Sequence, residues 1–133
     1  MTDLVIDSTL VREIEVIEQF TGPADETVDP GQYARLVPAT GKLSKGNASS
    51  AGEVGSGGGV CITRQVNTIT IVKKGIIWLG DGVLDALNFG ATVYLSNTDG
   101  TLADTAGTVS TAVGTVVPLY GHSTFKKALR VNL

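Results

Sequence analysis

Short segments in which apolar and polar residues alternate predict a chain built mainly of β-strands. The clearest is 67–72, where isoleucines alternate with threonines at a period of two. The last, 128–133, places two leucines and a valine on one face. Further strands are predicted at 32–37, 75–79, 91–96 and 113–120. With the first apolar segment they make about eight short antiparallel strands, which is typical of a compact β-barrel or sandwich.

The first apolar segment, from Val11 to Phe20, is predicted to be a strand, although its pattern is ambiguous. Ile14, Val16 and Phe20 share one strand face with Glu18, so neither face is wholly apolar. A helical spacing fits the segment almost as well. Because β-branched residues dominate the segment, we favour the strand.

One short helical turn is predicted near 81–87. Asp81 is a suitable residue to cap its start, and Val83, Leu84 and Leu87 would lie together on one side. The rest of the chain is predicted to be strand, turn or loop.

Two further segments are predicted to lie outside the strands. Residues 44–59 are rich in Ser, Gly, Ala and Asn and include a glycine run at 55–59, so a loop is expected there. Lys73-Lys74-Gly75 is expected to turn the chain between two strands.

An internal repeat is visible when the chain is shifted by 59 residues, which aligns 31–55 with 90–114. Six of the 25 aligned pairs are identical, and three of these six are glycines. Glycines at matching places predict the same positive-φ turns used twice, in two similar hairpin units. Chance similarity in a glycine-rich sequence is the alternative explanation.

The charge of the chain is unevenly distributed. The first 29 residues hold eight acids and a single base, Arg12, whereas the remainder carries a net positive charge and the whole chain −3. This asymmetry predicts an extended, acidic N-terminal arm at 1–12, followed by a single β-rich domain at 13–133. A solvated acidic face is the alternative. The net negative charge argues against nucleic acid as a partner, and we expect neither a signal peptide nor a membrane-spanning segment.

Side chains that could carry chemistry are few. His122 and Cys61 are the only histidine and the only cysteine, so neither a structural zinc site nor an intrachain disulfide is expected. The glycine run is not followed by the Lys-Ser or Lys-Thr pair of a phosphate-binding loop. We therefore predict no catalytic residue, no metal ligand, no cofactor and no enzymatic activity, and we expect Cys61 to be a buried apolar residue.

Several segments together resemble the small decoration (cement) proteins of tailed-phage capsids. Each motif is mainly a strand or a turn, and their order and spacing carry the resemblance over residues 13–133. The segments are Glu15–Ala24, Gly31–Arg35, Gly75–Asp81, Phe89–Leu102, Val113–Pro118 and Leu129–Leu133.

The resemblance implies a structural protein of the virion. Such a protein is made in the host cytoplasm, binds the outer surface of the assembled capsid and bridges subunits of the major capsid protein, often as a homotrimer. A ligand that binds only the assembled shell stabilises it by linkage, and contacts repeated over the lattice add through multivalency.

Five apolar residues are candidates for the capsid or subunit interface. Trp78 fits either a core position or an interface anchor. The others lie within residues 1–20, which we expect to leave the barrel and add a strand to a neighbouring decoration subunit or to the capsid. They are Val11, Ile14, Val16 and Phe20. A carbohydrate- or small-ligand-binding β module on a larger assembly is the alternative function.

Overall fold

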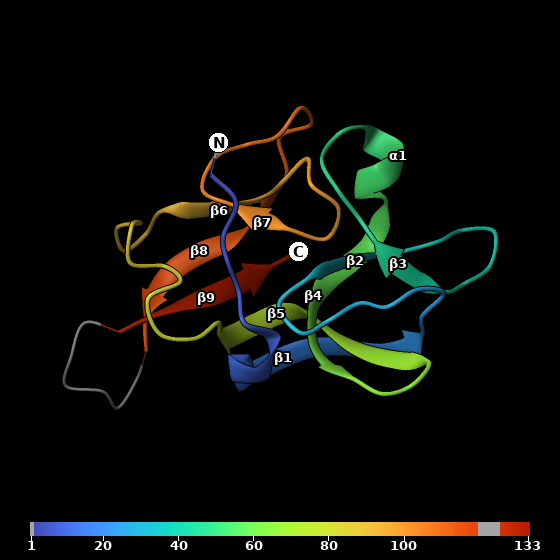
Figure 1. Cartoon of the computed structure of the whole chain (residues 1–133), viewed down its shortest axis with the longest axis horizontal. Coiled ribbons are helices and arrows are strands. Elements are labelled where there is room, and N and C mark those ends of the chain that lie inside the picture. Colours follow the sequence, from blue (N-terminus) through green and yellow to red (C-terminus); the bar gives the residue numbers. More distant parts are fainter. Residues whose placement is uncertain (1, 120–125) are drawn as a thin grey trace.

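The structure is a computed structural model that describes residues 2–119 and 126–133. It is mainly β, and its antiparallel sheet curls into a half-barrel (Figure 1). Two short helices accompany the strands: a 3-10 turn, η1, at Ser8–Leu10, and α1 at Ala51–Val54. The strands are β1 (Arg12–Pro23), β2 (Tyr33–Leu36), β3 (Leu43–Lys45), β4 (Ser56–Arg64), β5 (Thr68–Trp78), β6 (Thr92–Leu95), β7 (Leu102–Ala103), β8 (Ala112–Pro118) and β9 (Lys127–Asn132).

The strand order is symmetric about the middle of the sheet. It runs β3-β2-β4-β5-β9-β8-β6-β7, so that each strand of the first half has a counterpart at the same distance from the centre in the second half. β1 lies off this path and pairs with β5. Two similar four-stranded units therefore meet between β5 and β9, as Figure 1 shows.

The hairpins of the two units have the same register at an offset of 59 residues. In β2 and β3, Arg35 lies opposite Ser44, and in β6 and β7, Tyr94 lies opposite Ala103. The glycines before and between these strands have matching positive φ angles: 92° and 84° at positions 31 and 90, and 71° at both 41 and 100. A side chain is strained in this backbone region, which explains why glycine stands at each place.

The third pair of repeated glycines does not match in structure. Gly55 has φ of 65° and follows α1, whereas Gly114 lies in β8 opposite Val93. The place of Gly114 in the first unit is held by Gly59, which lies opposite Ala34. The four residues of α1 have no helical counterpart in the second unit, and the spacing differs by four residues.

The expectation of a loop throughout 44–59 is wrong, because β4 begins inside the glycine run. Gly58 packs under the ring of Tyr33, and a Cβ at that position would lie only 2.2 Å from the tyrosine hydroxyl. At Gly59, a Cβ would lie 2.7 Å from the carbonyl oxygen of Val72. Glycines are present here because neighbouring atoms occupy the side-chain space, and not because the segment forms a loop.

The turn expected at Lys73-Lys74-Gly75 is also absent, since β5 continues through these residues. Gly75 has φ of 149°, and a Cβ on it would lie 2.4 Å from the carbonyl oxygen of Glu15 in β1. β5 pairs with β1 along its whole length, and on its other edge with β4 first and then with β9. Gly75 thus lets one long strand belong to both units.

The helical turn expected near 81–87 is present as two tight turns. Asp85 N donates to Gly82 O, and Leu87 N donates to Leu84 O, at 3.3 and 3.0 Å. Leu84 is buried in the core.

Two hydrophobic clusters lie on opposite faces of the curled sheet. The larger fills the half-barrel and includes Val72, Ile77, Leu95 and Leu129. The smaller packs β3 and β4 against the start of β5, around Leu43 and Cys61 and the residues next to them. In the first half of β5, Ile69 and Ile71 belong to the smaller cluster and Val72 to the larger, so this strand contributes buried side chains to both clusters.

The N-terminal segment is extended, but the expectation that residues 1–20 leave the barrel is wrong for residues 2–20, because β1 pairs with β5 and the residues before β1 contact β7. Leu4 N donates to Leu102 O at 2.8 Å, and Asp3 forms a bridge with Ala103 of β7. Leu4 and Ile6 pack against the larger cluster. Burial of these apolar side chains holds the acidic segment on the domain.

Candidate interaction surface

The long edge strand β1 exposes apolar side chains. Its burial pattern is almost entirely exposed, and Ile14, Ile17 and Phe20 are 45%, 73% and 42% exposed. Among the described residues β1 pairs with β5 alone, so its other edge carries unpaired backbone groups. An exposed strand edge with apolar side chains is a template for pairing with another chain.

Irregular pairing between β1 and β5 explains the mixed faces seen in the sequence. The register shifts between Glu13 and Glu15, again between Val16 and Glu18, and once more between Glu18 and Gln19. Each bulge turns the following side chains toward the other face. Strict alternation therefore fails to predict which residues of β1 point outward.

The structure divides the five predicted interface residues into separate groups. Ile14 and Phe20 are exposed on β1. Val11 is only 3% exposed and belongs to the larger core cluster, and Val16 packs against the same cluster. Of these four residues, only Ile14 and Phe20 are therefore presented to a partner.

Trp78, the fifth, ends β5 and is partly buried. The amine of Lys126 lies 5.6 Å from the centre of its ring, a distance at which a cation and an aromatic face attract each other. Lys126 also pairs with Asp81 at 3.2 Å. Trp78 lines a hollow of about 410 Å³ together with Asp81 and Asp85, so it belongs neither wholly to the core nor to the β1 surface.

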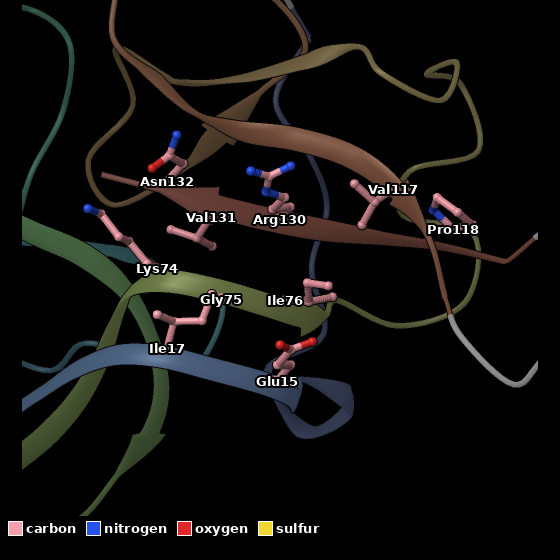
Figure 2. A pocket seen from close by; sticks show the side chains of 10 residues that line it. All are labelled: Glu15, Ile17, Lys74, Gly75, Ile76, Val117, Pro118, Arg130, Val131 and Asn132. Atoms are coloured by element: carbon pink, nitrogen blue, oxygen red, sulfur yellow. The ribbon is translucent and has the colours of Figure 1, made fainter.

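A second hollow of about 410 Å³ lies on the outward side of the sheet and spans β1, β5, β9 and β8 (Figure 2). Its apolar lining includes Ile17, Ile76 and Val117. Glu15 lies at the β1 side of the hollow, and Arg130 lies on β9, between Ile76 of β5 and the β8 side. We call this hollow the β1–β8 groove.

One row of side chains crosses the β1–β8 groove. Glu15 lies opposite Ile76, and Ile76 lies opposite Arg130, so the three residues are neighbours across three strands. Glu15 and Arg130 are exposed, and within the described residues neither is part of an ion pair. The row thus has an acid at one end, a base at the other and an apolar residue between them.

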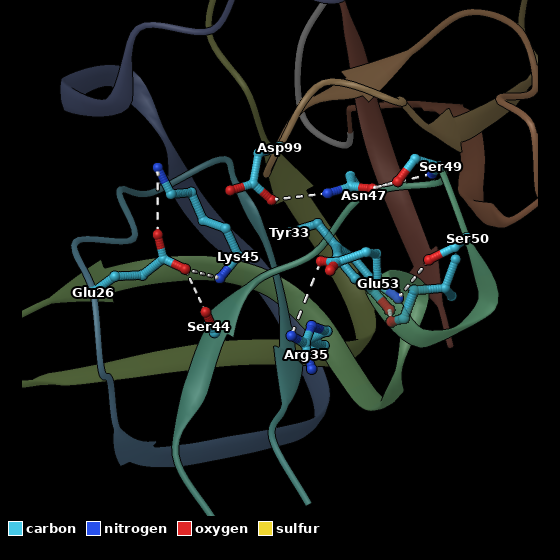
Figure 3. A network of polar contacts seen from close by, with 11 residues as sticks. Glu26, Tyr33, Arg35, Ser44, Lys45, Asn47, Ser49, Ser50, Glu53 and Asp99 are labelled. Carbon is cyan, nitrogen blue, oxygen red and sulfur yellow. Dashed lines mark hydrogen bonds and ion pairs between the residues drawn. The ribbon is translucent and has the colours of Figure 1, made fainter.

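The polar network shown in Figure 3 holds the first unit together, and one of its hydrogen bonds, from Asn47 Nδ2 to Asp99 Oδ1 at 3.2 Å, reaches the turn between β6 and β7 of the second unit. Glu26 accepts hydrogen bonds from Ser44 Oγ and Lys45 N, which ties the segment after β1 to β3. The Tyr33 hydroxyl donates to Val54 O at 3.0 Å and anchors α1. These groups are engaged in holding the fold, so we assign them no ligand.

The described residues contain no cluster of His, Cys, Asp or Glu that could hold a metal ion. Cys61 is buried, and this burial raises the pKa of its thiol to about 12. The thiol therefore stays neutral near pH 7 and is a poor nucleophile. His122 lies outside the described residues.

None of the helices in the described part of the chain is long and apolar enough to cross a membrane. No family model, no curated protein and no solved structure matches this chain. Function is therefore inferred from the residues and their arrangement, together with the resemblance to decoration proteins.

The sequence alone does not identify Ile17, Ile76 and Arg130 as residues that line one groove. The alternation in the last strand predicts that Arg130 points away from the apolar face, and it does. The pairing that sets it beside Ile76 and Glu15 joins strands far apart in sequence, and the sequence carries no local signal for it.

Proposed function

We propose that this protein is a non-enzymatic structural protein of a virion, which binds the outer surface of the assembled capsid and bridges subunits of the major capsid protein. The resemblance to decoration proteins suggests this role. The observation that carries the proposal is β1, a twelve-residue edge strand with exposed apolar side chains.

In this proposal a segment of the capsid protein adds to the outer edge of β1 as a further strand. Backbone hydrogen bonds supply affinity, and Ile14 and Phe20 are buried by the incoming chain. Because the pairing partner exists in the right place only on the assembled shell, binding stabilises the shell over its free subunits.

Co-sedimentation with expanded, undecorated capsids of the source virus tests the proposal, with unassembled capsid protein as the control ligand. Saturable binding to shells alone, with a raised melting temperature of the shell, is the expected result. Absence of binding to intact shells would remove the proposal.

Point substitutions test the surface better than deletion of residues 1–12, since that deletion would also remove Leu4, Ile6 and Val11 from the core. We expect Ile14→Asp combined with Phe20→Asp to weaken shell binding by about tenfold or more, because two apolar contacts are lost and charges are buried. Val66→Asp is the matched control, since Val66 is 93% exposed and lies in the turn between β4 and β5.

A second candidate function is small-ligand or carbohydrate binding at the hollow beside Trp78. The observation that favours it is the placing of an aromatic ring next to Asp81 and Asp85, because sugars bind through ring stacking and carboxylate hydrogen bonds. Trp78 is the only tryptophan of the chain, so its fluorescence reports on the hollow directly. Titration with soluble mono- and oligosaccharides should change its emission saturably, and an unchanged spectrum would exclude this candidate.

A further inference from the structure

The row Glu15–Ile76–Arg130 has a symmetry that suggests what covers the β1–β8 groove. Its ends carry opposite charges, and its centre is apolar. When such a row is turned over about a two-fold axis through its centre, each charged end meets its opposite. A surface of this kind is complementary to itself, which is the requirement for an isologous dimer.

We propose that the β1–β8 groove is a self-association surface, and that its occupant is the same groove of a second copy of this chain. The two-fold axis lies in the contact plane, along β5 at Ile76. Glu15 of each copy then faces Arg130 of the other, and the two Ile76 side chains meet on the axis.

The apolar lining fits the same arrangement. Ile17 is among the most exposed large apolar residues of the described chain, and the rotation sets it over β9 of the other copy, inside the groove. Burial of two such isoleucines and of the paired Ile76 residues supplies the non-directional part of the attraction, while the charged ends fix the register.

Lys74 is the charged group that lies close to the axis. It is next along β5 on the same outward side, and it lines the groove. Its cross-strand neighbour is Glu18 of β1, which offers the ammonium group a partner within its own chain. The two Lys74 side chains can therefore turn away from each other toward their own Glu18 residues.

The arrangement differs from the homotrimer that the resemblance implies. A trimer needs contacts between two different surfaces of the chain, whereas the row favours a contact of one surface with itself. Self-association through the groove does not depend on capsid binding, since it concerns only the chain and its copy.

Charge reversal tests the groove with the full-length protein. The mass in solution is measured by light scattering after size exclusion, over a range of concentrations. The wild type is expected to reach twice the 13.7 kDa of one chain. Glu15→Arg and Arg130→Glu are each expected to raise the dimer dissociation constant about a hundredfold, because each places like charges at two symmetric contacts.

Mixing the two variants is the decisive step. Glu15→Arg carries a base at both ends of the row, and Arg130→Glu carries an acid at both ends. An equimolar mixture should form a heterodimer that neither variant forms alone. A variant that merely misfolds is not rescued in this way. Lys42→Glu is the control reversal, because Lys42 is exposed in the turn between β2 and β3, away from the groove.

The proposal is overturned by a wild type that stays monomeric at all concentrations. It is equally overturned by a dimer or trimer that both reversals leave intact, or by a mixture that does not associate. Capsid co-sedimentation of the same variants separates the two proposals. Loss of the dimer with capsid binding retained supports the groove as a self-association surface and leaves the β1 edge as the capsid contact.

Discussion

Replacement of Gly114 by alanine should loosen the joint between β8 and β9. A Cβ at this position would lie 2.1 Å from the carbonyl oxygen of Arg130 and 2.8 Å from its carbonyl carbon. Both are backbone atoms, so the clash is not relieved by rotation of a side chain. The two strands have to separate by about 1 Å, since a carbon and a carbonyl oxygen normally stay more than about 3 Å apart.

The magnitude follows from what this separation disturbs. Gly114 lies opposite Val131 in the ladder that joins β8 to β9. Overpacking costs about 1–3 kcal/mol, and the weakening of one or two hydrogen bonds adds about 1 kcal/mol each. We therefore expect the free energy of unfolding to fall by about 3 kcal/mol, with a melting temperature lower by about 10 °C.

Urea unfolding followed by the fluorescence of Trp78 measures this change. Gly52→Ala is the matched control, because Gly52 lies in α1, has no positive φ, and has no atom within 4 Å of the place that a Cβ would take. That control should be neutral or more stable by up to about 1 kcal/mol, since alanine favours a helix over glycine. A melting temperature of Gly114→Ala within about 2 °C of the wild type would refute the close approach of the two strands.

Two further predictions concern the core. Leu43→Ala and Leu102→Ala remove fully buried side chains at matching places in the two hairpins, so each should lower the free energy of unfolding in urea by about 2–5 kcal/mol. A cost below about 1 kcal/mol for either would contradict its burial. The thiol of Cys61 should resist iodoacetamide at pH 8 in the folded protein and react after unfolding in urea. Burial raises the pKa of the Cys61 thiol from 9.0 to about 12 in the folded protein, so the thiol of the unfolded chain loses its proton at a lower pH. The free energy of unfolding should therefore fall as pH rises above about 9. Rapid labelling of the native protein would show that the site is open.

The sequence is sufficient to predict the two hairpins, for a physical reason. Gly41 and Gly100 each occupy a turn with φ of 71°, and a buried leucine stands two residues after each. Turn geometry and core position are both set by the residue itself and its near neighbours. Such local constraints are visible in one chain without its structure.

The glycine run misleads because glycine has two opposite uses. At Gly41 it supplies a backbone angle that other residues avoid, whereas at Gly58 and Gly59 it supplies empty space for Tyr33 and for the backbone of β5. Only the second use depends on residues distant in sequence. Local composition predicts a loop in both cases, and tertiary packing decides between them.

The candidate surfaces are predictable only in part, because they depend on pairing between distant segments. The sequence places Ile14, Phe20 and Val11 at an interface; the first two are exposed, while Val11 is buried. The register shifts between β1 and β5 decide which way each side chain points, and they fall opposite residues 72–77 of β5, on both sides of Gly75. Nothing within 11–20 indicates them.

The two outermost strands of the curled sheet are covered by residues that come just before and just after β1. The outer strands of the path are β3 and β7, and unpaired outer strands invite association with other chains. Residues on either side of β1 cover both of them: Asp3 forms a bridge with Ala103 of β7, and Ala24 forms one with Leu43 of β3.

Between these two bridges lies β1, whose outer edge has no partner among the described residues. The segment 3–24 therefore covers two edges of the sheet, at β7 and β3, and leaves a third edge, that of β1, open to a partner. Its glutamates suit this position, because charged side chains on an open strand oppose indiscriminate pairing. A partner that adds to β1 must offer both apolar contacts for Ile14 and Phe20 and charges compatible with Glu13 and Glu18. This double requirement is what would separate a specific assembly surface from an edge that merely aggregates.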